Sequence, residues 1–258
     1  NYRIRTSVYG DDSGSIYIVG RGDPSLTVSQ LQDLAKQLKA RGITQINRLI
    51  ADDNYFRGSA VNPTWEWEDV QAGHGAPVNS LILNRNAMDL MYWPQNVGEP
   101  LRITWVNPEE GNGWQVENNS ITVAPNEREF VEIGRDLFRP IVRVGGQLRA
   151  GAEPEPMYVA IVRPAENFLQ RFGEVLEAEG IRVLQSSISA SPPASQLTEL
   201  AAVNSEPLAE LIKELNLESD NVYVEALLKT LGARRQNSDA LEAGLKEMEI
   251  ALTELGVD

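Results

Sequence analysis

Residues 205–231, SEPLAELIKELNLESDNVYVEALLKTL, decide the fold of the C-terminal part of this chain. A serine that can cap a helix, followed by Glu-Pro, predicts a helix that begins near Ser205. The apolar residues of this helix share one face: Leu208, Leu211, Ile212 and Leu215. Val222 to Leu231 predicts a second helix. The polar run Ser219-Asp220-Asn221 therefore lies in a turn between two helices.

The rest of the chain mixes strands and helices. Residues 3–9 and 15–19 predict a hairpin, and a helix over 27–42 leads to a strand at 43–50. Residues 52–151 contain short strand patterns separated by Pro, Gly and Asn, which predict a β-rich subdomain. A helix over 164–180, a strand at 181–184, a Ser-rich loop at 186–195 and a third C-terminal helix capped by Ser238 follow. This order predicts the α+β class.

Composition excludes several classes of function. The 258 residues carry a net charge of −14, and such an acidic surface repels phosphate backbones, so we expect no nucleic-acid binding. Disulfides and thiol catalysis are excluded because there is no cysteine. His74, the single histidine, lies between two glycines and is interpreted as a solvent-facing turn residue. The sequence contains no apolar stretch of about 18 residues that would predict a membrane span.

The Ser219-Asp220-Asn221 run has two interpretations. Ser and Asn side chains accept backbone N–H bonds, so the run is also an ordinary helix-capping turn. Alternatively, the hydroxyl and the carboxamide serve an acyl-transfer enzyme. Such an enzyme needs a hydroxyl that passes a proton to the leaving amine and an amide that binds a peptide substrate.

A Ser-x-Asn triplet is one of three motifs that build the active site of penicillin-recognising serine enzymes. The other two motifs, a Ser-x-x-Lys nucleophile and a Lys-Thr/Ser-Gly strand, are missing from this sequence. No serine has a lysine three residues later, and the only Lys-Thr pair, Lys229-Thr230, is followed by Leu231 and not by glycine. The acidic runs Asp52-Asp53 and Glu66 to Asp69 lack the spacing of a cation-binding loop. We therefore expect no metal and no organic cofactor.

Several ordered blocks carry a wider resemblance. They are Ile16-Tyr17-Ile18-Val19 with Gly22-Asp23-Pro24-Ser25-Leu26; Leu49-Ile50-Ala51-Asp52-Asp53 with Trp65-Glu66-Trp67; Gly75-Ala76-Pro77 with Asn84-Arg85-Asn86; and Ser219-Asp220-Asn221-Val222-Tyr223. With these blocks the chain resembles low-molecular-mass penicillin-binding proteins of the D-alanyl-D-alanine carboxypeptidase/endopeptidase type. These proteins carry domains inserted into their catalytic domain.

The resemblance implies a domain plan and roles for two residues. Residues 1–203 would be the inserted domains, with an α/β layer over about 1–51 and 152–203 and a β-rich subdomain over about 52–151. Residues 204–258 would be the helical part of a transpeptidase-like domain. Ser219 would be the catalytic proton-relay hydroxyl, and Asn221 would bind the substrate amide. Asp220 is given no direct role.

In that family the nucleophile precedes the inserted domains and the Lys-Thr-Gly strand follows the Ser-x-Asn helices. We therefore expect an internal fragment of a serine-type D-Ala-D-Ala carboxypeptidase that is inactive by itself. The resemblance implies peptidoglycan stem peptides and β-lactams as partners of the intact protein, and the periplasm or cell envelope as its location. We also expect self-association through uncovered helices in 205–258. The alternative is a non-catalytic binding or scaffold module of the cell envelope.

Overall fold

The computed structural model describes residues 2–189, 197–235 and 238–257, and the chain divides into two compact units. Unit 1 consists of Asn1–Ala60, Val78–Arg85 and Arg163–Asp258. Unit 2 consists of Val61–Pro77 and Asn86–Val162. The helices and sheets of the two units confirm the predicted α+β class. None of the helices in the described ranges is long and apolar enough to cross a membrane.

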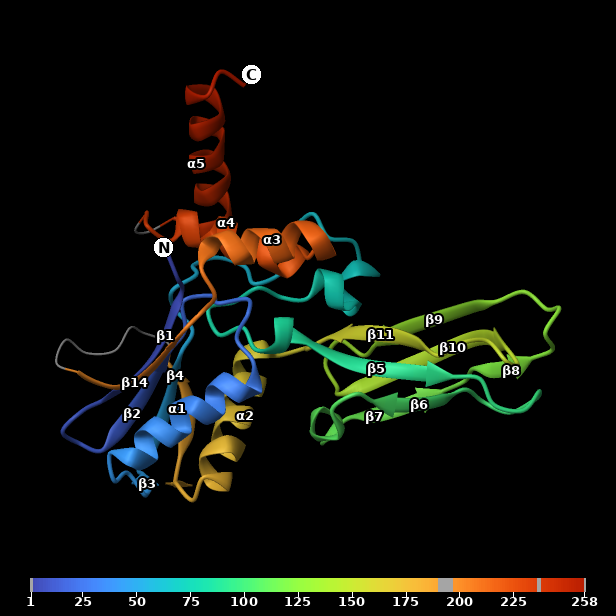
Figure 1. The fold of residues 1–258 in the computed structure, drawn as a ribbon, viewed down its shortest axis with the longest axis horizontal. Coiled ribbons are helices and arrows are strands. Elements are labelled where there is room, and N and C mark those ends of the chain that lie inside the picture. Colours follow the sequence, from blue (N-terminus) through green and yellow to red (C-terminus); the bar gives the residue numbers. More distant parts are fainter. Residues whose placement is uncertain (1, 190–196, 236–237, 258) are drawn as a thin grey trace. The chain divides into compact units, whose positions relative to one another are not determined.

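Unit 1 is built on a mixed sheet with the strand order β13-β4-β2-β1-β14 (Figure 1). The strands are β1 (Arg5–Gly10), β2 (Ser15–Val19), β4 (Arg48–Asp52), β13 (Ser186–Ser189) and β14 (Thr198–Asn204). The predicted β1–β2 hairpin is closed by Asp11, whose Oδ1 accepts from the backbone N–H groups of Ser13 and Ser15 at 2.9 Å. β4 pairs in parallel with β2, as expected when a helix connects two strands.

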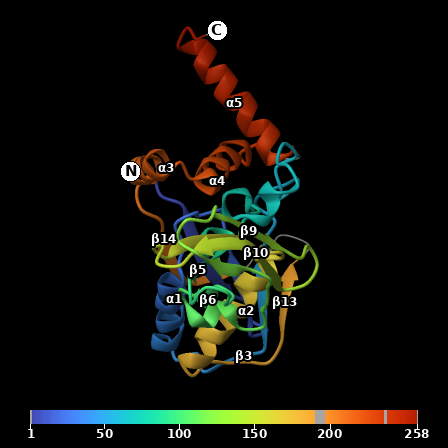
Figure 2. The same ribbon diagram turned by 90° about the vertical axis from the view of Figure 1, so that its right-hand side faces the viewer.

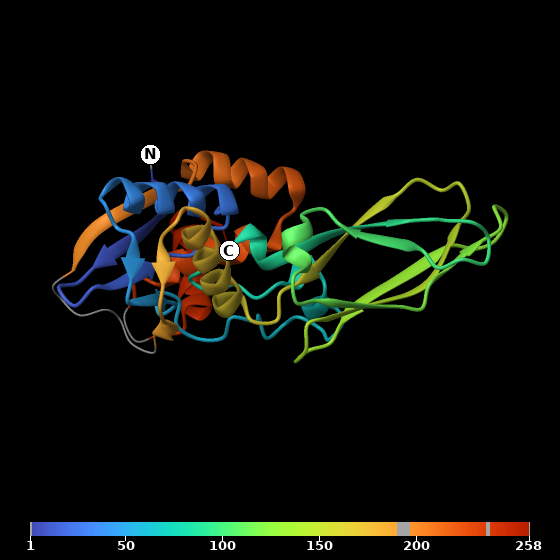
Figure 3. The ribbon, with the colours of Figure 1, turned by 90° about the horizontal axis from the view of Figure 1, so that it is seen from below.

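Helices α1 (Val28–Ala40) and α2 (Pro164–Ala178) contact each other and share one core with this sheet, and Figure 3 shows the two helices as neighbours that cross at an angle. The predicted apolar stripe of α1 is fully buried: Leu31, Leu34, Ala35 and Leu38. Phe168 and Phe172 of α2 join the same core, where strand residues such as Ile18 and Leu49 meet them. A short parallel pair, β3 (Gln45–Ile46) with β12 (Arg182–Val183), lies at the end of this layer. Burial of these stripes is the main stabilising contribution.

The C-terminal helices of unit 1 are α3 (Leu208–Glu218), α4 (Asn221–Gly232) and α5 (Ala240–Glu254). α4 and α5 meet through glycines: a Cβ on Gly232 would overlap the Ala240 carbonyl, and one on Gly244 would overlap the Leu228 carbonyl. Figures 1 and 2 both show α5 extending away from α4. The small-residue face of α5 is thus buried, while its longer apolar side chains are not.

Unit 2 is strand-rich. One sheet has the order β11-β5-β6, and the other has β7-β10-β8 with β9 also paired to β10. The strands are β5 (Ala87–Trp93), β6 (Arg102–Trp105), β7 (Gln115–Asn118), β8 (Ile121–Val123), β9 (Phe130–Arg135), β10 (Ile141–Arg149) and β11 (Glu155–Ala160). Short 3₁₀ turns are η1 (Asp69–Gln71), η2 (Gly73–Gly75) and η4 (Pro108–Gly111). A core around Leu90, Val142 and Val159 joins the sheets.

Some sequence-based expectations were wrong. Residues 186–189, predicted as a loop, form β13, because parallel pairing with β4 satisfies backbone groups whatever the side chains are; residues 190–196 lie outside the described ranges. Ser205 and Ser238 do not cap helices: the N-cap positions are Pro207 and Asp239. Ser205 instead accepts the Ile4 N–H at 2.9 Å, which ties the N-terminal segment to β14.

The compact units also differ from the expected ranges. Residues 52–60 cluster with unit 1, residues 152–162 with unit 2, and the helices after residue 204 with the α/β layer of unit 1. The division into inserted domains (1–203) and a transpeptidase-like piece (204–258) stays a prediction.

Candidate active site

The Ser-Asp-Asn turn joins α3 to α4 as expected, but its middle residue is the cap. Ser219 ends α3 in the left-handed conformation (φ 53°), and Asn221 is the first residue of α4. Asp220 Oδ1 accepts from the backbone N–H groups of Val222 at 2.9 Å and Tyr223 at 3.2 Å. Ser219 is exposed and Asn221 is half-buried. Because Asp220 caps α4, the Ser219 hydroxyl is not used for capping that helix.

The second carboxylate oxygen of Asp220 binds an arginine from a distant part of the chain. Arg85 Nε lies 2.9 Å from Asp220 Oδ2, and the Asp220 side chain is only 12% exposed. Arg85 Nη2 also donates to Glu214 of α3 at 3.1 Å. The guanidinium carbon stands 5.5 Å from the centre of the Tyr223 ring on α4, within cation–π range. Burial raises the pKa of the Tyr223 hydroxyl, although the charge of Arg85 opposes this.

Arg85 lies in a short backbone segment of unusual conformation. Asn84, Arg85 and Asn86 all have positive φ values, 48°, 57° and 52°. The left-handed region costs a non-glycine residue about 1–2 kcal/mol, less for Asn than for most others. In unit 1 the Asn84 N–H donates to the Leu26 carbonyl at 2.9 Å, which helps to hold the segment in place.

α4 has another polar anchor two turns after its capped end. Lys229 is 1% exposed, and its Nζ donates to the carbonyls of Val78 at 2.7 Å and Ser59 at 3.0 Å. Burial lowers the pKa of Lys229, while the negative charge of Glu225 opposes this shift. Thr230 donates to the Ala226 carbonyl within the helix. Lys229 and Thr230 therefore serve to hold α4, consistent with their failure to match a Lys-Thr-Gly strand.

A cavity of about 410 Å³ lies elsewhere in unit 1. Tyr9, Val19 and Asp52 line it, and these strand residues alternate with core residues, so they face away from α1 and α2. Arg21 also lines it, with its guanidinium 5.1 Å from the centre of the Tyr55 ring. Neither Ser219 nor Asn221 is a lining residue, so this cavity is separate from the turn.

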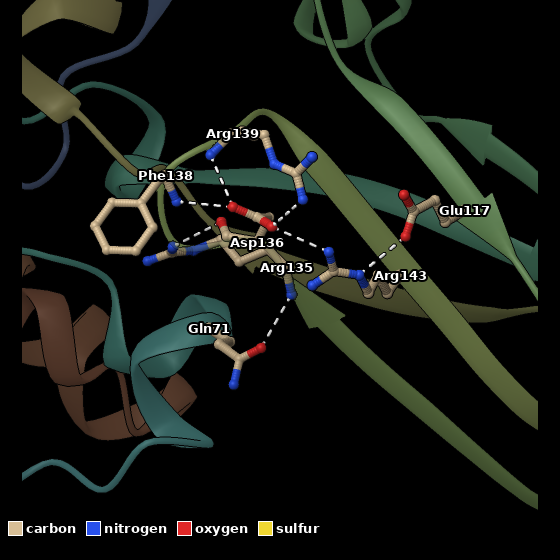
Figure 4. A network of polar contacts seen from close by, with 7 residues as sticks. All are labelled: Gln71, Glu117, Arg135, Asp136, Phe138, Arg139 and Arg143. Atoms are coloured by element: carbon tan, nitrogen blue, oxygen red, sulfur yellow. Dashed lines mark hydrogen bonds and ion pairs between the residues drawn. The ribbon is translucent and has the colours of Figure 1, made fainter.

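In unit 2 another aspartate organises a turn (Figure 4). Asp136 Oδ1 accepts the backbone N–H groups of Phe138 and Arg139 at 3.0 Å. Its Oδ2 accepts from the side chains of Arg139 at 2.9 Å and Arg143 at 3.0 Å. These bonds, above all that from Arg139, hold the pKa of the Asp136 carboxyl well below its usual range. The turn presents Phe138 to solvent.

His74 behaves as an ordinary surface group, whereas Asp52 of the acidic run Asp52-Asp53 is buried. The His74 side chain is 55% exposed, as predicted, and its Nε2 lies 3.2 Å from Asp69. Within the described ranges, no group of three or more acidic or histidine side chains is arranged to hold a metal ion. Sequence reasoning thus predicted that Ser219 and Asn221 lie in a turn between two helices, but it did not predict the capping role of Asp220 or the contacts with Arg85 and Glu214. The roles given to Ser219 and Asn221 stay predictions. The Asn84-Arg85-Asn86 block was noticed without any indication of its partner.

Comparison with known families gives a match over the whole chain. The family described as D-Ala-D-Ala carboxypeptidase 3 (S13) matches residues 1–258. Among curated proteins, the chain is 28% identical over 252 residues to a D-alanyl-D-alanine carboxypeptidase of Actinomadura sp. (strain R39), which covers 94% of this chain and 46% of that protein. It is 25% identical over 264 residues to penicillin-sensitive carboxypeptidase A of Dictyostelium discoideum, covering 96% of this chain and 51% of that protein.

A solved structure has the same fold. The crystal structure of penicillin binding protein 4 (dacB) from Haemophilus influenzae superposes with a TM-score of 0.81 at 20% identity. The match covers 100% of this chain and 58% of that one. The chain thus spans about half the length of the curated relatives that it matches.

Proposed function

Because the chain belongs to the D-Ala-D-Ala carboxypeptidase 3 (S13) family, we propose that it is part of a serine-type D-Ala-D-Ala carboxypeptidase. The observation that carries this proposal is the match over residues 1–258 together with the exposed Ser219 in its capped turn. The substrate class is the D-Ala-D-Ala end of peptidoglycan stem peptides, and the location is the cell envelope.

In the proposed reaction a serine outside this chain attacks the carbonyl carbon of the D-Ala-D-Ala amide. The C–N bond breaks, an acyl-enzyme forms and the terminal D-alanine leaves as the amine. Ser219 passes the proton that the leaving nitrogen takes up, and the Asn221 carboxamide binds the substrate amide by donating and accepting hydrogen bonds. Water then hydrolyses the acyl-enzyme.

β-Lactams are the second expected ligand class. Their strained amide acylates the same serine, and the ring-opened product stays attached. Support comes from relatives alone: a curated relative is named a penicillin-sensitive carboxypeptidase, and a solved structure of the Haemophilus influenzae protein is titled as complexed with a novel β-lactam.

Labelling with a fluorescent penicillin tests the proposal. We expect no covalent label on residues 1–258, which contain no Ser-x-x-Lys motif, and stoichiometric label on the longer protein that includes the flanking sequence. Label on the short chain would contradict the assignment of the nucleophile to another part of the protein. A longer protein that takes no label would instead favour the non-catalytic scaffold module.

Self-association is a further expectation for the isolated chain. The apolar side chains of α5 predicted to face inward are substantially exposed, among them Leu245 at 53% and Met248 at 47%. Burying such surface yields roughly 25 cal/mol per Å². Light scattering over a concentration series should show reversible association of residues 1–258, weakened in a Leu245→Glu, Met248→Glu variant. A chain that stays monomeric at high concentration would contradict this expectation.

A further inference from the structure

We propose that Arg85 is a positioning residue for the Ser-Asp-Asn turn and acts through Asp220 on Ser219 and Asn221. This inference rests on the proposed function, because it concerns how the two proposed active-site side chains are held. Arg85 holds the turn and does not itself act on the substrate.

The first observation is the division of labour between the oxygens of Asp220. Oδ1 caps α4 through two backbone N–H groups, and Oδ2 pairs with Arg85 Nε at 2.9 Å. A helix cap needs only the first oxygen. With both oxygens bound, the carboxylate cannot rotate, and the peptide units that carry Ser219 and Asn221 are fixed on either side of it.

The second observation is that the Arg85 guanidinium contacts each element that meets at the turn. It pairs with Glu214 on α3 at 3.1 Å, with Asp220 in the turn, and lies over the Tyr223 ring on α4. The planar, forked guanidinium can make these contacts together, whereas the point charge of a lysine cannot. Arg85 therefore fixes the angle between α3 and α4 at the residue where Ser219 projects.

The third observation concerns the backbone that presents Arg85. Three consecutive non-glycine residues, Asn84 to Asn86, are left-handed. Such conformations persist only where the surrounding structure imposes them, and they cluster at functional sites. An arginine needed only for surface charge does not require such a backbone, so the strain indicates a demand on where this side chain is placed.

Positioning matters to the proposed chemistry because acyl transfer depends on near-attack geometry. A displacement of about 1 Å of a catalytic group can reduce a rate by about 10²-fold. Loss of Arg85 leaves the Asp220 cap in place, so α4 still forms, but α3 and α4 can then change their angle at Ser219.

The experiment uses the longer protein that contains this chain and measures the saturating rate of acylation by a fluorescent penicillin. The variants are Arg85→Gln, Ser219→Ala and the double variant. Arg5→Gln is the matched control, since it removes another surface arginine pair of unit 1, that with Glu199 at 2.5 Å. Melting temperatures are recorded for every variant.

Arg85→Gln should lower the acylation rate about 10- to 100-fold, with a melting temperature close to that of the control. In the Ser219→Ala background the same change should lower the rate by a clearly smaller factor, because only Asn221 is then left to position. Equal effects in both backgrounds, or a rate loss no greater than that of Arg5→Gln, would overturn the inference while leaving the proposed function intact. Absence of label on the unaltered longer protein would overturn both.

Asp220→Asn provides an independent test should Arg85→Gln fail to fold. A carboxamide has one oxygen, so it cannot both cap α4 and accept from Arg85. We expect a several-fold slower acylation, with the melting temperature close to that of Arg5→Gln because the α4 cap is retained. An unchanged rate in Asp220→Asn contradicts the inference.

Discussion

The turns built on Asp220 in unit 1 and on Asp136 in unit 2 use the same chemistry over different sequence distances. Each aspartate accepts two backbone N–H groups with one oxygen and arginine with the other. The arginines of Asp136 are its near neighbours Arg139 and Arg143, so its own bonds stay at one hairpin end, although Arg143 also pairs with Glu117 of β7. Asp220 is paired with Arg85, a residue from a distant segment, so its network joins separate elements. The same set of bonds to an aspartate can therefore stabilise a single turn or hold together segments that are far apart in the sequence.

The largest effect is expected at Lys229, whose buried ammonium group also joins α4 to residues that are far away in the sequence. Lys229→Ala removes the ammonium group that donates to the Ser59 and Val78 carbonyls, and with it a buried positive charge near Glu225. We expect a loss of about 3 kcal/mol in the free energy of unfolding. Far-UV circular dichroism follows it in unit 1, because α1–α5 all belong to that unit.

The matched control for Lys229→Ala is Lys246→Ala, an exposed lysine of α5, which should change the free energy by less than about 0.5 kcal/mol. If the two substitutions proved equally mild, α4 would not depend on its long-range polar anchor, and the distinction between the two kinds of network would be lost.

A direct comparison of the two aspartates is the next test. Asp220→Ala removes a helix cap and leaves Arg85 without one partner, for an expected cost of about 2 kcal/mol. Asp136→Ala removes the carboxylate bonds of a local turn, but the side chains of Arg139 and Arg143 can then be hydrated, so we expect a cost of about 1 kcal/mol. Asp33→Ala, at an exposed carboxylate of α1, is the control and should cost almost nothing. The reverse order for the first two would show that sequence distance does not decide the effect.

The features that could be predicted from the sequence are those set by local patterns, and the features that were missed depend on contacts between distant residues. The helices α1, α2, α3 and α4 were found because their apolar spacing is local information. β13 was missed because pairing with β4, not the composition Ser-Ser-Ile-Ser, makes it a strand. The predicted inward face of α5 was wrong because Gly232 and Gly244 bring two backbones together, which apolar periodicity does not reveal.

The turn that carries Ser219 and Asn221 was predicted from a short motif and the helices that flank it, and the roles of the two residues stay predictions. The sequence did not show which residue of the run caps α4, because Ser, Asp and Asn are all good N-cap residues and stand next to one another. The pairing of Asp220 with Arg85 could not be predicted from one sequence, because no local pattern links residue 85 to residue 220.

The smallest expected effect is the pH dependence of the stability of unit 2. The pKa of Asp136 is lowered in the folded state, chiefly by its bond from Arg139, so its stabilising contribution is complete above the unfolded pKa of about 3.9. It is lost as pH falls below that value towards the folded pKa. All five tryptophans lie within unit 2, so their fluorescence reports the melting temperature of that unit. We expect this melting temperature to decrease as the pH is lowered from 5 to 2.

Asp136→Asn should flatten part of that pH dependence, because the amide does not titrate. Glu129, whose pKa is lowered mainly by its bond from Arg149, also contributes to the pH dependence of the melting temperature, and this contribution should remain in the variant. An identical pH profile for Asp136→Asn and the unaltered protein would contradict the role given to the Asp136 network.

The decisive measurement is the rate at which the longer protein is acylated by a fluorescent penicillin when Ser219 or Asn221 is replaced by alanine. A hydroxyl that relays the proton and a carboxamide that binds the substrate predict losses of at least about 10²-fold for each. Ser29→Ala, at an exposed serine of α1, should leave the rate unchanged. If Ser219→Ala and Asn221→Ala were both acylated as fast as that control, this turn would be a helix cap and nothing more.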